Sequence, residues 1–173
     1  DYVFPKDYPG DADATFDSLQ EFLTLYEGRD DITARPIPVL QPPHVEHYRE
    51  HEEFYQEFSH IAIGGLHPFE AAEQVTIIKQ VRDVVGPHTY LHGFGVGTSL
   101  PLIKALREYA PLLDSLDVST PERAIRNGSI PDATMTQRKF ATPFGEDSTT
   151  VRAQFASAIL TSINYLLSDK VNE

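Results

Sequence analysis

The strongest constraint in this sequence is a repeated alternation of short apolar runs with longer amphipathic segments. The apolar runs have the length of β-strands and are bounded by Pro, Gly or polar residues. In the longer segments, apolar residues recur every three or four positions, as they do on one face of an α-helix. The pattern therefore predicts strands at residues 2–5, 36–41, 60–63, 89–93 and 112–117, and helices at residues 14–28, 44–58, 71–85, 102–109, 122–128 and 149–167.

Strands that alternate with helices predict βαβ units and a parallel sheet, so the expected fold class is α/β. No GxGxxG motif opens the first βα turn, and the sequence contains no Walker A motif. Both absences disfavour a nucleotide-binding doubly wound fold. A flavodoxin-like sheet and part of a (β/α)8 barrel, or TIM barrel, both remain. Residues 129–149 form the longest stretch that we predict to be irregular.

A complete barrel typically takes about 250 residues, whereas this chain has 173. On the barrel interpretation, residues 1–173 form a single domain that corresponds to the later strands, and the first strands would precede residue 1. The edge of the strand at residues 2–5 would then be open, and open edges favour association. We accordingly expect a homo-oligomer or a complementing N-terminal segment.

The composition and charge of the chain exclude or disfavour several classes of function. Acidic residues outnumber basic residues 26 to 14, which argues against nonspecific nucleic-acid binding by bulk charge. The absence of Cys excludes disulfides, a thiolate nucleophile and Cys-ligated zinc. The N-terminal residues do not show the pattern of a signal peptide, and no run approaches the roughly 20 apolar residues of a membrane span. We expect no membrane association and a cytoplasmic location.

Polar residues and glycines follow the predicted strands where each strand ends. In parallel α/β folds, ligands bind at the carboxyl ends of the strands. Each of these residues alone has a simpler interpretation, such as a turn glycine or a helix cap, but together they predict a polar ligand site. They are Asp7, Gln41, Gly64, Gly65, Leu66, the glycine-rich run at residues 93–97, and Asp117.

Three histidines fall on one face of the predicted helix at residues 44–58. They are His44, His47 and His51, and Glu50 lies beside them in the sequence. Such a cluster could ligate a metal. Because the segment lacks the HExxH pattern, we interpret it as a solvated polar face and predict no metal site there.

The segment at residues 114–128 resembles the signature of the tRNA-guanine transglycosylase family. That signature places a nucleophilic Asp three residues after another Asp and before Pro-x-Arg and Asn-Gly. The matching residues are Asp114, Asp117, Pro121, Arg123, Asn127 and Gly128. Four further segments resemble the family and follow its order: DYVFPKD at residues 1–7, PVLQ at 38–41, IAIGGL at 61–66 and YLHGFGVGT at 90–98.

The resemblance implies a (β/α)8 barrel enzyme, a pentosyltransferase, that replaces guanine in tRNA by a 7-deazaguanine base. It implies that Asp117 is the catalytic nucleophile and forms a covalent bond to ribose C1′. The residues that would bind the base are Asp7, Gln41, Gly64, Gly65 and Leu66, and those that would contact the nucleic acid are Arg123 and Arg126. The exchange is not a redox reaction, so we expect no cofactor.

The sequence departs from the family in three respects. It lacks the early Asp-Ser-Gly-Gly-Phe-type motif and the Cys-rich zinc site, and Gln41 is followed by Pro-Pro where Gly-Gly is usual. Three alternatives therefore stay open. They are the same exchange on DNA in a viral or mobile modification system, a non-catalytic transglycosylase-like partner subunit, and an unrelated α/β enzyme.

Overall fold

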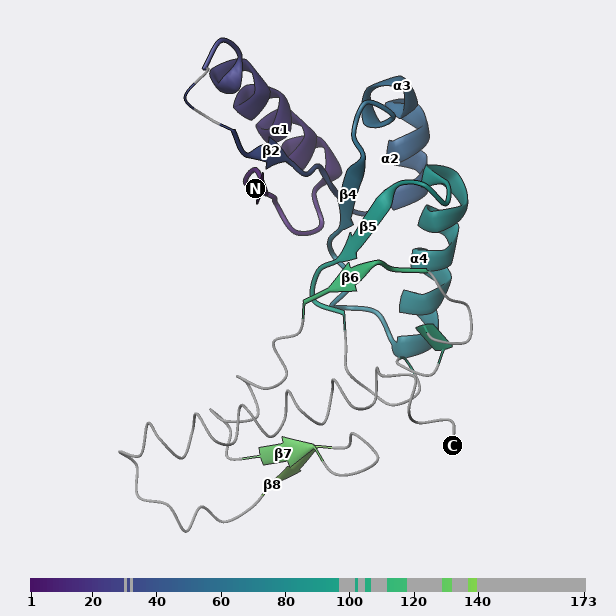
Figure 1. Cartoon of the computed structure of the whole chain (residues 1–173). Coiled ribbons are helices and arrows are strands. Elements are labelled where there is room, and N and C mark those ends of the chain that lie inside the picture. The colour runs from purple at the N-terminus through teal and green to yellow at the C-terminus, as the bar shows by residue number, and fades with distance from the viewer. Residues whose placement is uncertain are drawn as a thin grey trace, which may run out of the picture. The chain divides into compact units, whose positions relative to one another are not determined.

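The computed structural model describes residues 1–29, 31, 33–96, 102, 105–106, 112–117, 129–131 and 137–139. The chain divides into two compact units. The first comprises Asp1–Val96 with Ala110–Asp117, and the second comprises Gly97–Tyr109 with Val118–Glu173. Strands β1 to β6 and helices α1 to α4 all belong to the first unit (Figure 1).

The centre of the first unit is a parallel sheet whose strands lie side by side in the order of the chain. It consists of β3 (Val39–Leu40), β4 (His60–Ile63), β5 (Tyr90–Gly93) and β6 (Ser115–Leu116). Each pair is parallel, and the register aligns Ile63 of β4 with Leu40 and with Gly93. The carboxyl ends of the strands therefore meet at one edge of the sheet. The predicted α/β class with parallel strands is confirmed.

The strand predicted at residues 36–41 is divided in the structure. β2 (Arg35–Pro36) pairs in parallel with β1 (Tyr2–Val3), while β3 pairs with β4. The backbone between them stays hydrogen-bonded on both sides. The N–H of Ile37 donates to the C=O of Val3, and the C=O of Pro38 accepts from the N–H of Ala62, both at 2.8 Å. Because proline has no N–H, the two prolines interrupt the ladder without ending the extended segment.

In the part of the first unit that the structure describes, four helices accompany the strands. α1 (Ala12–Tyr26) begins after Asp11, whose carboxylate accepts from the N–H of Ala14 at 3.0 Å, as an N-cap residue does. The helix predicted at residues 44–58 forms two helices, α2 (His44–Glu50) and α3 (Glu52–Tyr55), which meet at His51. α4 (Ala71–Val85) has the predicted bounds. Figure 1 shows α2, α3 and α4 beside strands β4 and β5.

Apolar side chains from the strands and from α4 form the core. The most completely buried are Leu40, Ile61, Ile63, Leu91, Ile78 and Val81. α2 packs against α4, and Phe16 of α1 lies against Phe54 and Tyr55 of α3, with ring centroids 5.1 and 5.9 Å apart. α2 therefore contacts both α3 and α4, and α1 contacts α3.

Other predictions concern the second unit and the chain termini. The helices predicted at residues 122–128 and 149–167 lie outside the described residues, as does most of the helix predicted at 102–109. The stretch predicted to be irregular contains an antiparallel pair, β7 (Ser129–Pro131) and β8 (Gln137–Lys139), so that prediction was wrong there. Strands of three residues are too short to show a clear alternation. None of the described helices combines the length and apolar character that a membrane crossing needs.

An ion pair ties α4 to the start of β6. Arg82 donates to Asp114 at 2.7 Å, and the same carboxylate oxygen accepts from the N–H of Leu91 at 2.7 Å. The guanidinium also donates to the C=O groups of Gly86, Thr89 and Leu112. Asp114 therefore links the backbone of β5 to α4 and fixes where β6 begins.

We expect Asp114→Ala to lower the free energy of unfolding by about 1–3 kcal/mol. The substitution removes a charged hydrogen bond and leaves the N–H of Leu91 without this acceptor. Asp31→Ala is the matched control, since it breaks the Arg29–Asp31 ion pair, which is similarly short but lies in solvent, where such pairs contribute little. Urea unfolding of both variants tests the difference, and equal losses would contradict it.

Candidate active site

A cavity of about 450 Å³ lies at the carboxyl ends of the strands. It brings together loops that follow β1, β3, β4 and β5. Four of the residues predicted to bind the base line it, namely Asp7, Gly64, Gly65 and Leu66, and so does Gly95 of the predicted glycine-rich run. The remaining lining residues are Pro9, Gly10, Pro42, His67, Pro68, Phe69 and Phe94.

Gln41 lies beneath this cavity and is 0% exposed. Its Nε2 donates to Asp7 Oδ2 at 3.0 Å, and its Oε1 accepts from the N–H of Gly10 at 3.0 Å. Both ends of the buried amide are thus satisfied within the chain, as buried polar groups require. The sequence predicted a residue that contacts the base, whereas the structure places Gln41 where it holds Asp7 and the loop before α1.

Gly64 and Gly65, which follow β4, have no side chains, and this makes room for the side chain of Gln41 and for Pro42. A Cβ at residue 64 would lie 2.9 Å from Gln41 Cδ, and a Cβ at residue 65 would lie 2.6 Å from Pro42 Cδ. Gly65 also has φ of +68°, a conformation that other residues rarely adopt. Glycine is therefore required at residue 64 for space, and at residue 65 for both space and backbone conformation.

His44 anchors the same loop from the first turn of α2. Its Nε2–H donates to the C=O of Gly64 at 2.8 Å. Burial lowers the pKa of His44 below its ordinary value, although this hydrogen bond and the charge of Glu46 oppose the shift. The ring is therefore neutral at neutral pH and acts here as a hydrogen-bond donor to the glycine loop.

Asp117 lies directly after β6, as the sequence predicted. Its N–H donates to the C=O of Gly93 at 3.1 Å, and its Oδ1 accepts from the N–H of Gly95. Asp117 is exposed, and Gly95 lines the cavity. This contact holds the carboxylate of Asp117 beside Gly95 at the rim of the cavity, although Asp117 is not itself one of the lining residues.

His92 on β5 supplies an imidazole near Asp117. Its Nδ1 is hydrogen-bonded with Ser115 Oγ at 2.7 Å, and its ring lies 4.8 Å from that of Phe94. Burial lowers the pKa of His92, while the negative charge of Asp117 acts in the opposite direction. Of His92, Asp117 and Phe94, only Phe94 lines the cavity itself, and the imidazole of His92 is packed against the Phe94 ring.

Sequence reasoning missed Gly10, which acts through its backbone N–H and carries no sequence signal beyond that of a turn residue. Gly95 lines the cavity and belongs to the glycine-rich run at residues 93–97 that the sequence placed at a strand end. Phe94 lies in the same run and lines the cavity, but its aromatic ring was not singled out. The two predicted nucleic-acid contacts, Arg123 and Arg126, lie outside the described residues.

The interpretation of residues 44–51 as a solvated face was wrong for two of its histidines. His44 and His47 are buried, and only His51 is half-buried. The reason is tertiary packing. His44 is hydrogen-bonded to the C=O of Gly64, and Phe16 of α1 lies against His47 and His51, with ring centroids 5.5 and 4.1 Å apart. Polarity alone could not predict that another helix would cover this face.

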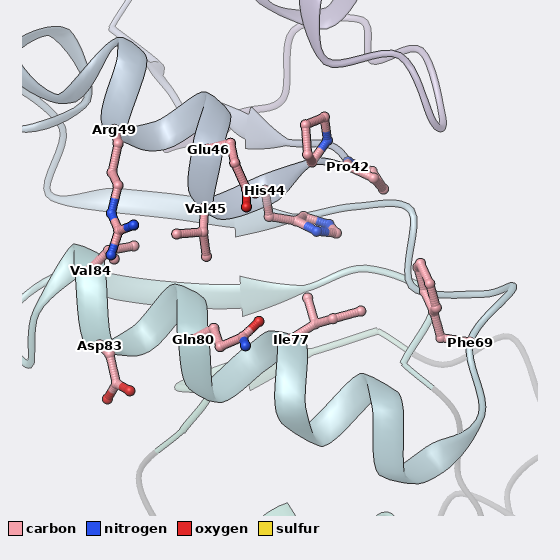
Figure 2. A pocket seen from close by; sticks show the side chains of 11 residues that line it. Pro42, His44, Val45, Glu46, Arg49, Phe69, Ile77, Gln80, Asp83 and Val84 are labelled. Atoms are coloured by element: carbon pink, nitrogen blue, oxygen red, sulfur yellow. The ribbon is translucent and has the colours of Figure 1, made fainter.

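A second cavity, of about 460 Å³, lies between α2 and α4 (Figure 2). Its charged lining residues are Glu46 and Arg49 on α2 and Asp83 on α4, and Phe69 lies at one end. None of the site residues predicted from the sequence lines it. We therefore place the candidate active site at the strand ends.

No protein-family model matches this chain, and a search of curated proteins finds no significant match.

We expect Gly64→Ala to reduce the free energy of unfolding by about 1–3 kcal/mol, because the new methyl group would displace the Gln41 amide. Gly64 has no positive φ, so the cost is steric. The same substitution in a Gln41→Ala background should cost much less, since the shorter side chain vacates the space. A double-mutant cycle from urea unfolding measures this coupling, and additive effects would contradict the packing argument.

Proposed function

We propose that this chain is part of a (β/α)8 barrel that exchanges guanine in a nucleic acid for a 7-deazaguanine base, with tRNA as the acceptor. The observation that carries the proposal is the convergence of Asp7, Gly64, Gly65 and Leu66 on one cavity, with Asp117 bonded at its rim. The family resemblance depends on separate segments of the sequence. The convergence of the residues from these segments at one cavity is a separate, structural observation.

The strand order supports the barrel interpretation. The strands follow one another as β3-β4-β5-β6 with no reversal, whereas doubly wound sheets reverse their order at a switch point. α2 and α4, which follow consecutive strands of the sheet, pack against each other. A barrel places all its helices in one outer layer and its active site at the carboxyl ends of its strands.

The cavity suits recognition of a purine-like base. Its volume of about 450 Å³ falls within the range of roughly 300–1,000 Å³ that is typical of small-molecule sites. The Asp7 carboxylate accepts hydrogen bonds from the N–H edge of the base, and backbone N–H groups at Gly65 and Leu66 donate to its carbonyl oxygen. Gln41 acts indirectly, by orienting Asp7 through the hydrogen bond at 3.0 Å.

Asp117 is the proposed nucleophile. Its carboxylate attacks ribose C1′ as the glycosidic bond breaks, and guanine leaves with the bonding electrons and takes up a proton. The incoming 7-deazaguanine then loses its own ring proton and attacks C1′, which releases Asp117. The proton gained by guanine balances the proton lost by the incoming base, so no redox cofactor takes part.

The acceptor nucleotide must be unpaired or flipped out of its stack to reach such a cavity. With 26 acidic and 14 basic residues, the chain has little bulk attraction for phosphate. Arg123 and Arg126 are the proposed local contacts to the backbone of a cytoplasmic tRNA. DNA is the alternative acceptor, and the experiment below distinguishes the two.

We expect Asp7→Asn to raise the Kd for a 7-deazaguanine base at least about tenfold. Asn keeps an oxygen that can accept from Gln41 but presents an amide donor to the N–H edge of the base, and a mispaired buried group costs about 1–3 kcal/mol. Isothermal titration calorimetry on the whole chain measures the change. Asp17→Asn, at an exposed acid on α1, is the control. An unchanged Kd for Asp7→Asn would remove Asp7 from the base site.

We expect Asp117→Asn, introduced into the chromosomal gene, to eliminate the 7-deazaguanine nucleoside from the affected nucleic acid. Mass spectrometry of nucleosides from purified tRNA and from DNA measures both pools. Loss from tRNA supports the proposal, and loss from DNA alone changes the acceptor. Persistence in both pools, with calorimetric base binding intact, identifies a non-catalytic partner subunit and overturns the proposed catalysis. Asp83→Asn, at an exposed acid on α4, is the control and should change neither pool.

A further inference from the structure

Two imidazoles and a carboxylate converge at the C-terminal end of α2, on residues that do not line the candidate active site. One ligand atom from each of His47, Glu50 and His51 lies within 4.8 Å of the others. His47 and His51 are four residues apart, the spacing at which paired histidines of one helix bind zinc. We propose that these three residues bind a divalent transition metal such as Zn²⁺.

The first observation in favour of the metal site is the environment of His47. Its side chain is only 4% exposed, and its Nε2 is buried with no hydrogen-bond partner among the described residues. Its Nδ1 lies 3.8 Å from Asp13 Oδ1. A buried ring nitrogen without a partner is costly, and a histidine that binds a metal through one nitrogen commonly directs the other toward a carboxylate. In the proposed site Nε2 of His47 is the ligand atom, and Asp13 of α1 is the outer carboxylate near Nδ1.

The aromatic environment orders both rings. Phe16 stacks on His51 with centroids 4.1 Å apart and planes at 21°, and it meets His47 edge-on at 5.5 Å and 77°. The two imidazole centroids are 4.8 Å apart. Rings held by packing lose little conformational freedom when they bind an ion, so part of the entropic cost of binding is already met.

Charge favours a cation at this place. A cavity of about 390 Å³ adjoins His47 and Glu50, and its lining includes three further carboxylates, Asp11, Asp13 and Glu46. Coordination uses the neutral form of an imidazole, whose unprotonated ring nitrogen has the lone pair, and the surrounding carboxylates supply the negative charge that a divalent ion needs.

Metal binding requires the three ligand atoms to move slightly closer to one another. Zn–N bonds of about 2.0–2.1 Å in a tetrahedral site bring ligand atoms to roughly 3.3 Å from one another, closer than the present upper limit of 4.8 Å. Glu50 is exposed, so its side chain can move toward the two imidazoles, which the packing against Phe16 already orders. Two imidazoles favour zinc-like ions over Mg²⁺ and Ca²⁺, which prefer oxygen ligands alone.

The test is a zinc titration of the whole, untagged, chelator-treated chain by isothermal titration calorimetry. We expect one Zn²⁺ per chain, and we expect His51→Gln and Glu50→Gln each to raise the Kd at least about tenfold, as loss of a ligand does. His88→Gln, at an exposed histidine of the turn before β5, is the matched control and should leave the Kd unchanged. The two variants replace surface-accessible side chains, and circular dichroism verifies that they remain folded.

Two further measurements complete the test. Zn²⁺ should raise the Tm of the wild-type chain and of His88→Gln but not of the ligand variants, because an ion that binds only the folded state stabilises it. Co²⁺ should give the visible absorption bands of a tetrahedral complex in the wild-type chain. An absence of stoichiometric binding, or an equal loss in His51→Gln and His88→Gln, would overturn the site.

Discussion

The buried amide of Gln41 is the interaction on which the candidate active site depends. Each end of the amide is bonded to a segment more than 30 positions away in the sequence, the carboxylate of Asp7 and the N–H of Gly10. A fully buried amide left without these partners would carry a large desolvation cost. The same side chain leaves no room for a Cβ at residues 64 and 65. One residue thus determines the positions of an acid, a loop and a pair of glycines.

The α/β class and the parallel strands of the described sheet could be predicted because each strand has a distinct apolar run in the sequence. The runs at residues 60–63 and 89–93 carry strong apolar signals, and β4 and β5 occupy them almost residue for residue. Parallel register then aligns whatever follows each strand. Asp7, Gly65 and Asp117 could be expected at one edge of the sheet from topology alone, before any side-chain contact was known.

The parts that could not be predicted depend on contacts between segments distant in sequence. The local sequence around Gln41 is the same whether its side chain contacts a ligand or hydrogen-bonds to Asp7. The difference lies in contacts with residues far away in the sequence. His47 and His51 resemble a solvated face in the sequence, but Phe16 of α1 packs against both. Likewise, the sequence shows the prolines at residues 36 and 38 but not the pairing of the residues around them. In the structure β2 pairs with β1, whereas β3 pairs with β4.

Two acidic residues flank the short strand β6, and they have different roles. One stabilises the fold, and the other is the proposed nucleophile. Asp114 precedes β6 and binds Arg82 and the N–H of Leu91, whereas Asp117 follows β6 and accepts only at the Gly95 loop among the described hydrogen bonds. Because β6 contains just Ser115 and Leu116, a shift of one residue at its start would move Asp117 off the rim of the cavity. The ion pair at one end of the strand is therefore what positions the carboxylate at the other.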